Sequence, residues 1–278
     1  VKTEENSISE NYNNKKRKIK SFYIPQADVS YTETDDAIFA LSEIRRMDKK
    51  IAKRINKNLI WKEKMNGVLV VNKEKNMTSR DVVNVLTKEF NTKKIGHTGT
   101  LDPIAEGVLV VCIGNYTKLS NIITCEYIEY IAQMKLGIKT DTLDITGNII
   151  AKEEVSSITL DDIKKVISNF PQKYMQTVPK YSAVHVDGKR LYEYARNNID
   201  VELPKREVEI YSIELISNLK DNKFSIRTSV SKGTYIRSLV NDIAHRLNTI
   251  GVMSALRRTK LGNISIDNCK KIDNISLS

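Results

Sequence analysis

Short apolar runs separated by polar segments constrain the fold of this 278-residue chain more than any other feature. Gly67–Val71 and Gly107–Ile113 are rich in valine and have the length of a strand, so both predict fully buried β-strands. Neither approaches the roughly 20 apolar residues that a membrane-spanning helix needs. Tyr127–Leu136 alternates apolar and polar residues instead, which predicts a strand with one buried face.

Helical patterns lie between these strands without alternating regularly with them. Three stretches repeat apolar residues at helical spacing, and Thr78 or Ser79 and Thr159 are suited to cap the first two: about residues 79–90, 160–170 and 234–247. Two more strands are predicted at about Val208–Ile216 and Phe224–Val230. We therefore expect an α+β domain with a mixed, largely antiparallel central sheet flanked by helices.

The chain is strongly basic, with 45 Lys and Arg against 34 Asp and Glu and a net charge of +11. Such an excess attracts polyanions, of which nucleic acid is the commonest, although solubility alone is the alternative explanation. Residues 1–64 form a basic N-terminal extension, partly disordered over its first twenty residues, with a helix expected at about 34–60. This basic helix would either lie on RNA or form a solvated face.

Cysteine and histidine usage indicates a reduced compartment and no metal. Cys112, Cys125 and Cys269 are widely spaced and form no C-x-x-C pair, so a disulfide framework and a zinc knuckle are both disfavoured. His185 and His245 are isolated and lack partners at ligand spacing. The N-terminus carries no apolar signal core. We expect a cytoplasmic protein with no membrane segment and no metal.

The most informative stretch is residues 96–103, Gly-His-Thr-Gly-Thr-Leu-Asp-Pro, which is followed by Gly107. It lies between a predicted helix and a predicted buried strand, where a rigid scaffold can present a loop. The glycines permit close backbone approach, and Pro103 fixes the backbone directly after Asp102. Asp102 is therefore a candidate functional carboxylate. The alternative is a turn in which it only accepts hydrogen bonds from nearby amides.

Two further stretches combine cations with small or aromatic residues. Residues 231–237, Ser-Lys-Gly-Thr-Tyr-Ile-Arg, join a strand to a helix but lack the P-loop pattern, so Arg237 either serves a site or makes a surface pair. Residues 181–196 interleave aromatic and basic side chains, which suits base stacking and phosphate contact. An ordinary amphipathic helix would show the same pattern.

These stretches, together with N-G-V-L-V-V-N-K at 66–73 and L-G-x-x-T-D-T at 136–142, resemble one family, the tRNA pseudouridine synthases of the TruB type. The resemblance covers roughly residues 65–262, with five separated motifs in the family's order. It implies a pseudouridine-synthase-like catalytic domain that flips out a tRNA uridine, at position 55 of the TΨC loop, and isomerises it. The isomerisation involves no redox step or external group, so we expect no cofactor.

The resemblance also implies roles for individual residues. Asp102 corresponds to the family's catalytic aspartate, Tyr130 to its active-site tyrosine, and Arg237 to the arginine that pairs with the carboxylate. Five further residues are expected to contact the substrate or the RNA: His97, Tyr235, Leu256, Lys73 and Lys232. Asp141 and Asp144 are expected to structure their loop or to support the residues around the site.

The sequence departs from the family pattern at two places. The usual Lys-Pro near the first strand is Lys73-Glu74, which leaves the placement of Lys73 less constrained. Nineteen residues follow Thr259, too few for the RNA-binding PUA domain of many relatives, so residues 263–278 are expected to form a short tail without a complete PUA domain. We hypothesise that the basic N-terminal helix supplements RNA binding.

The expected partner is the TΨC stem-loop of tRNA, with no obligate protein partner. One rival reading is a related synthase with another RNA target, such as a guide-dependent, dyskerin-like enzyme. The other is a non-catalytic RNA-binding or tRNA-folding protein, against which the presence of Asp102, Tyr130 and Arg237 counts.

Overall fold

The computed structural model describes residues 66–120, 127–155 and 157–275. The extension expected at 1–64, including its helix at 34–60, and Cys125 lie outside these residues. No helix in the described part of the chain is long and apolar enough to cross a membrane.

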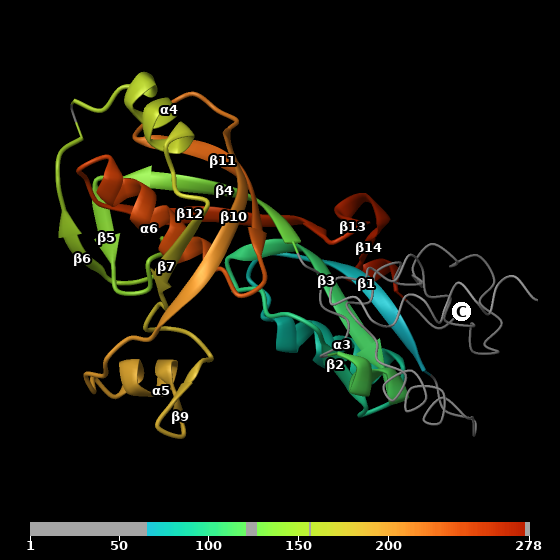
Figure 1. Ribbon diagram of the computed structural model, residues 1–278. Helices are drawn as coiled ribbons and strands as arrows, with labels where there is room; N and C mark the ends of the chain where they lie inside the picture. Colours follow the sequence, from blue (N-terminus) through green and yellow to red (C-terminus); the bar gives the residue numbers. More distant parts are fainter. Residues whose placement is uncertain (1–65, 121–126, 156, 276–278) are drawn as a thin grey trace, which may run out of the picture.

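One ten-stranded sheet organises the described chain (Figure 1). Its order is β14-β1-β3-β12-β4-β11-β10-β7, with β2 paired to β3 and β13 paired to β12. The β1–β14 and β3–β12 pairings are parallel and the others antiparallel, which confirms the expected mixed, largely antiparallel α+β fold. The strands are β1 (Gly67–Lys73), β2 (Ile95–His97), β3 (Ala105–Ile113), β4 (Tyr127–Leu136), β7 (Lys173–Thr177), β10 (Lys205–Leu215), β11 (Lys223–Ser231), β12 (Gly251–Leu261), β13 (Ile264–Ser265) and β14 (Lys270–Lys271).

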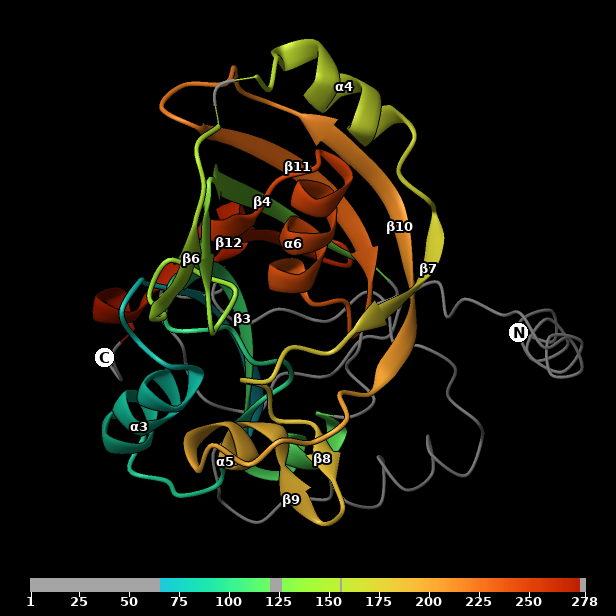
Figure 2. The same cartoon turned by 90° about the vertical axis from the view of Figure 1, so that its left-hand side faces the viewer.

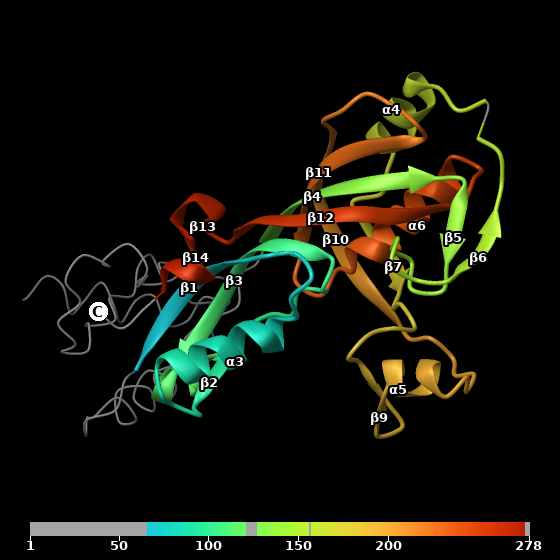
Figure 3. The same ribbon diagram turned by 180° about the vertical axis from the view of Figure 1, so that it is seen from behind.

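Helices cover the two ends of this sheet separately (Figures 1 and 3). Helix α3 (Ser79–Glu89) packs Val82, Val83 and Leu86 against β1 and β3. Helix α6 (Ile236–Arg246) lies in the hollow of the curved sheet formed by β4, β10, β11 and β12, and α4 (Leu160–Ser168) lies beside β10 (Figure 2). A predicted cap is confirmed at α3, because Thr78 and Asp81 form a reciprocal capping box.

Three small units extend from this framework. Strands β5 (Ile138–Thr140) and β6 (Ile149–Lys152) form a hairpin after β4. Strands β8 (His185–Val186) and β9 (Lys189–Arg190) form a second hairpin that leads into α5 (Leu191–Arg196), beyond the end of β7 (Figure 3). The 3₁₀ helices are η2 (Gly114–Leu119), η3 (Ile266–Asn268) and η4 (Ile272–Asn274).

Strand β12 is central to the sheet, yet its sequence did not predict a strand. It pairs with β3 on one side and β4 on the other, so it joins the two helix-covered ends. Its register against β4 shifts between Met253 and Ala255 and again between Arg258 and Lys260. These irregularities break the period of two on which strand prediction depends, because each extra residue moves the following side chains to the opposite face.

Residues 263–275, expected to form a short tail, add to the same sheet. Strand β13 pairs with the end of β12, and β14 runs parallel to β1 through Val71 and Lys270. Ile272 is buried and belongs to the apolar cluster under α3. This segment therefore completes the edge of the ten-stranded sheet.

Gly107 should be irreplaceable at the β3–β12 junction. Its φ is +108°, and a Cβ atom there would lie against the main-chain carbonyl oxygen of Arg258, far inside van der Waals contact. We expect Gly107→Ala to lower the free energy of unfolding by about 2–4 kcal/mol, since both backbone strain and a backbone clash oppose it. Urea denaturation would measure the change.

Gly67→Ala is the matched control, because a Cβ atom at Gly67 would meet nothing within 4 Å. It should change stability by less than about 0.5 kcal/mol. Equal effects of the two substitutions would contradict the close approach of β3 and β12 at Gly107.

Candidate active site

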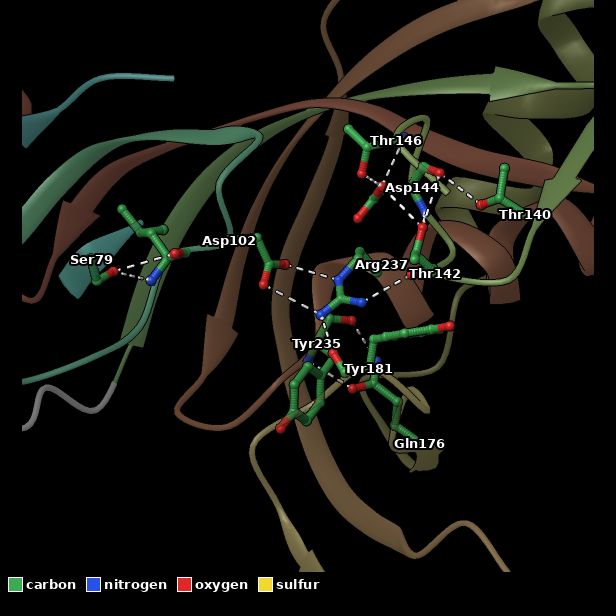
Figure 4. Close-up of polar contacts among 11 residues, drawn as sticks. Ser79, Asp102, Thr140, Thr142, Asp144, Thr146, Gln176, Tyr181, Tyr235 and Arg237 are labelled. Atoms are coloured by element: carbon green, nitrogen blue, oxygen red, sulfur yellow. Dashed lines mark hydrogen bonds and ion pairs between the residues drawn. The ribbon is translucent and has the colours of Figure 1, made fainter. Parts of the chain in front are cut away.

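The loop between β2 and β3 is fixed from the side of α3. The Ser79 Oγ accepts a hydrogen bond from the Leu101 N–H at 2.9 Å and lies 3.2 Å from the Leu101 carbonyl oxygen (Figure 4). Asn76 donates its N–H to the carbonyl oxygen of Pro103 at 2.8 Å. Asp102 therefore stands between two anchored neighbours, so the backbone that carries its carboxylate is held in place before any ligand arrives.

Arg237, in the first turn of α6, holds that carboxylate (Figure 4). Its Nε lies 2.9 Å from Oδ2 of Asp102, and its Nη2 lies 3.4 Å from Oδ1. The Arg237 side chain is 6% exposed and the Asp102 side chain 33% exposed, so the arginine is enclosed while the carboxylate stays accessible. This fork geometry fixes the orientation of the carboxylate as well as its charge.

Two main-chain carbonyls complete the surroundings of the guanidinium. Arg237 Nη1 donates to the Thr142 carbonyl oxygen at 2.9 Å, and Nη2 donates to the Tyr181 carbonyl oxygen at 3.0 Å. A buried arginine is costly unless its donors are paired, and here acceptors from three separate segments pair them. The same bonds bring the β5–β6 turn and the segment after β7 to the site.

Aspartates shape the turn that presents Thr142, as the sequence suggested. Asp144 is 6% exposed, and its Oδ1 accepts hydrogen bonds from the Thr146 N–H at 2.9 Å and the Thr142 hydroxyl at 3.1 Å. Asp141 Oδ1 accepts a bond from the Asn148 N–H at 2.8 Å. Both carboxylates thus bond within their own turn.

Gln176 of β7, which sequence reasoning missed, holds the main chain of Tyr235 (Figure 4). Its Oε1 accepts a bond from the Tyr235 N–H at 2.8 Å, and its Nε2 lies 3.2 Å from the Tyr235 carbonyl oxygen. Nε2 also donates to the Tyr174 hydroxyl, which in turn donates to Asp242 at 2.9 Å. This chain of hydrogen bonds, centred on the buried Gln176, sets the start of α6 and hence the position of Arg237, two residues further on.

A cavity of about 390 Å³ opens beside the Asp102–Arg237 pair. Its walls are largely apolar and aromatic, and they are drawn from β4, β12, the loop before β3, the loop before α6 and the segment 181–192. Six of the eight predicted site residues line it: Asp102, Tyr130, Lys232, Tyr235, Arg237 and Leu256. Such a pocket suits a planar ring with polar substituents at its edge.

His97 and Lys73 do not line this cavity. His97 lies on β2, and burial together with the nearby charge of Arg258 lowers the pKa of its imidazole, so the ring is neutral at pH 7. Its Nδ1 is buried with no hydrogen-bond partner among the described residues. His97 is the last residue of β2, ahead of the loop that carries Asp102.

Lys73 was expected to contact RNA, but the structure encloses it completely. It is 0% exposed at the end of β1, and its Nζ donates to the carbonyl oxygens of Glu74 at 2.8 Å and Met77 at 2.6 Å. Burial lowers the pKa of its ammonium from 10.5 to about 8, although the negative charge of Asp102 opposes that change. The prediction that Lys73 contacts RNA directly is therefore wrong, because its ammonium points toward main-chain carbonyls and is enclosed by the protein.

Arg258 is a second buried cation that the sequence did not reveal as part of the site. It is 2% exposed and lines the cavity, while its Nε donates to the Val108 carbonyl oxygen at 2.7 Å. Its Nη2 lies 3.3 Å from the Gly99 carbonyl oxygen. In sequence it is one of two adjacent arginines on a strand that was not predicted, so nothing marked it as buried. Arg258 links β12 to the loop that carries Asp102.

The described residues contain no group of three or more His, Cys, Asp or Glu side chains placed to hold a metal ion.

The fold and the cavity describe an α+β protein with an arginine-bound carboxylate beside a pocket with apolar and aromatic walls. Residues 87–236 match the family model described as TruB family pseudouridylate synthase, N-terminal domain. The chain belongs to the TruB family of pseudouridylate synthases, and it is accordingly an isomerase.

Curated relatives agree over most of the chain. The tRNA pseudouridine synthase B of Clostridium tetani is 44% identical over 213 residues, which cover 76% of this chain and 73% of the relative. The enzyme of the same name from Fusobacterium nucleatum is 45% identical over 203 residues, which cover 73% of this chain and 70% of the relative.

Solved structures show the same fold. A Cbf5–Nop10–Gar1 complex contains a chain with 28% identity and a TM-score of 0.58, over 79% of this chain and 55% of that one. The archaeal box H/ACA sRNP Nop10–Cbf5 complex contains a chain with 25% identity and a TM-score of 0.54, over 74% of this chain and 51% of that one. This chain spans about half the length of those structural relatives.

The buried Lys73 makes a pH-dependent contribution to stability. Its pKa in the folded protein is about 8, below its ordinary value of 10.5, so the unfolded chain binds more protons between these values. Stability therefore rises with pH across that interval. We expect the free energy of unfolding of the wild type, minus that of Lys73→Met, to increase from pH 8 to pH 10 in denaturant titrations.

Lys75→Met, at an exposed lysine of the following turn, is the control and should give a difference independent of pH. A flat profile for Lys73→Met as well would show that Lys73 is not a buried ammonium.

Proposed function

We propose that this chain converts the TΨC-loop uridine of tRNA to pseudouridine, with Asp102 as the catalytic carboxylate. The observation that carries the proposal is the accessible carboxylate of Asp102, held by the buried Arg237 at the side of a cavity with aromatic walls. Relatives named tRNA pseudouridine synthase B, at 44–45% identity, support tRNA as the substrate.

The reaction breaks the bond between N1 of uracil and C1′ of ribose, turns the ring, and joins C5 to C1′. A proton leaves C5 and N1 gains one, so atoms and oxidation state balance without a further reactant. A base inside a folded loop must first leave its stack, at a cost of about a few kcal/mol. A cavity that encloses the base offsets part of this cost.

Asp102 and Arg237 would act as one unit. The carboxylate would attack the nucleoside or stabilise an electron-poor C1′, and both roles require its ionised form. The two guanidinium contacts, at 2.9 and 3.4 Å, fix the direction of the carboxylate. Because the carbonyls of Thr142 and Tyr181 hold the rest of the guanidinium, Arg237 stays in place when substrate binds or product leaves.

Aromatic and apolar side chains would hold the uracil while it turns. Tyr130 is 7% exposed and stands on the buried face of β4, and Leu256 faces the same cavity from β12. Tyr235 adds a third wall, its main chain held by Gln176. Aromatic and aliphatic side chains can pack against the faces of a ring while it turns.

Basic residues at the rim would contact the RNA backbone. Lys232 is exposed at the mouth of the cavity, where its ammonium can reach a phosphate. The net charge of +11 favours association with a polyanion in general. His97, set back on β2, would support the loop next to the bound RNA.

The rival readings are less well supported. The matching chains in the two Cbf5-containing complexes are 25–28% identical, whereas the tRNA pseudouridine synthase B relatives are 44–45% identical, which favours tRNA over a guided RNA target. A purely RNA-binding protein has no need of a carboxylate held by an enclosed arginine. A tRNA-folding activity is compatible with catalysis.

Asp102→Asn should reduce turnover by at least about a thousandfold, because the amide carries no charge and is a poor nucleophile. Tritium release from tRNA transcripts labelled at uridine C5 measures turnover directly. Binding of tRNA should change by less than about threefold, since the cavity walls and the rim are unaltered.

Asp221→Asn, on the exposed β10–β11 turn, is the matched control and should keep wild-type turnover. A transcript with the TΨC uridine replaced should release no tritium with the wild-type enzyme. Turnover near wild type in Asp102→Asn would remove Asp102 from its role, and release from the altered transcript would move the target elsewhere.

Arg237→Lys tests the two-point contact of the guanidinium with Asp102 rather than its positive charge. Lysine keeps a positive charge but cannot span Asp102 and both carbonyls, so we expect turnover to fall about 10- to 100-fold and stability to fall by about 1–3 kcal/mol. Arg227→Lys alters the exposed pair with Glu214 and should change neither quantity appreciably. Full activity of Arg237→Lys would contradict a role for the fork geometry.

A further inference from the structure

One hydroxyl in the cavity wall is buried without a hydrogen-bond partner. Ser182 is 5% exposed and lines the cavity, and its Oγ has no partner among the described residues. The other buried side-chain atom of this kind in the described part of the chain is Nδ1 of His97, which lies outside the cavity wall. Burying a hydroxyl without a hydrogen-bond partner costs stability. An unpaired hydroxyl at a cavity wall therefore points to a ligand that supplies the missing hydrogen bond.

Main-chain hydrogen bonds to α5 hold the segment that carries Ser182, while its hydroxyl stays unpaired. The Ser182 carbonyl oxygen accepts a bond from the Tyr192 N–H at 3.1 Å, and the Leu191 N–H donates to the Val184 carbonyl oxygen at 2.8 Å. The start of α5 thus fixes this segment. Ser238, another buried serine, donates its hydroxyl to the Thr177 carbonyl oxygen at 2.8 Å and so needs no ligand.

The position of Ser182 identifies the group that it would bind. Its neighbour Tyr181 offers its carbonyl to Nη2 of Arg237, and the same Nη2 lies 3.4 Å from the Asp102 carboxylate. Ser182 therefore belongs to the side of the cavity where the carboxylate lies. Under the proposed function, C1′ of the flipped uridine must lie against Asp102, and the carbon bonded to C1′ carries the 2′-hydroxyl.

We propose that the Ser182 hydroxyl hydrogen-bonds the ribose 2′-hydroxyl of the flipped uridine and so helps the site to select RNA over DNA. This inference rests on the proposed function. Both hydroxyls donate and accept, so either can supply the proton of the bond. The 2′-hydroxyl is also the group by which a protein distinguishes the two nucleic acids at one nucleotide.

The test compares two hairpin RNAs with the TΨC stem-loop sequence, one with uridine and one with 2′-deoxyuridine at the target position. Dissociation constants are measured in the Asp102→Asn background, which prevents conversion during the titration. We expect Ser182→Ala to weaken binding of the uridine hairpin about tenfold and to leave binding of the deoxyuridine hairpin unchanged, since the loss corresponds to one hydrogen bond to a buried group.

Thermal unfolding separates this role from a structural one. Ser182→Ala should keep or raise the melting temperature, because it removes an unpaired buried hydroxyl. Ser238→Ala, the matched control, should lower the melting temperature and leave the ratio of the two dissociation constants as in the parent protein.

The proposal is overturned if Ser182→Ala weakens both hairpins equally, which would assign the hydroxyl to another group of the RNA. It is overturned too if neither constant changes, or if the melting temperature falls as it does for Ser238→Ala. Failure of the proposed function appears separately, as absence of tritium release by the wild-type enzyme from the uridine hairpin.

Discussion

The enclosed charge of Arg237 is the constraint on which the site depends. A guanidinium at 6% exposure needs acceptors for its donors, and these come from Asp102 and from the carbonyls of Thr142 and Tyr181. Three loops from distant parts of the sequence therefore meet at one side chain. Any shift of one loop would leave a buried donor unpaired, so the arginine keeps all three in register.

Hydrogen bonds from three further side chains support this arrangement. Ser79 holds Leu101 beside Asp102, Gln176 holds Tyr235 beside Arg237, and Asp144 shapes the turn of Thr142. All three are buried; Ser79 and Gln176 accept bonds from main-chain N–H groups, and Asp144 accepts bonds from the Thr142 hydroxyl and the Thr146 N–H. The geometry is thus set before substrate enters, which favours fast chemistry over adaptation to many ligands.

Sequence reasoning predicted what depends on local pattern. The alternation in Tyr127–Leu136 predicted β4 with its exact bounds, the caps and apolar stripes predicted α3 and α4, and helical spacing predicted α6. The motif residues Asp102, Tyr130 and Arg237 meet at one cavity, as the family resemblance implied.

What could not be predicted depends on register or on the third dimension. Two register shifts break the alternating pattern of β12, so that strand was not predicted. Nothing in the sequence distinguishes the buried Lys73 and Arg258 from surface cations. The carbonyls of Thr142 and Tyr181 carry no sequence signal at all, because every residue has one.

The role of β12 also sets an order of assembly. It follows the other long strands of the described residues in sequence and yet lies in the middle of the sheet, between β3 and β4. During synthesis the two ends of the sheet can each collapse on their own helices, but they remain unjoined until residues 251–261 emerge. Contacts so distant in sequence form slowly, so the cavity beside Asp102 closes only after β12 has joined the two ends of the sheet.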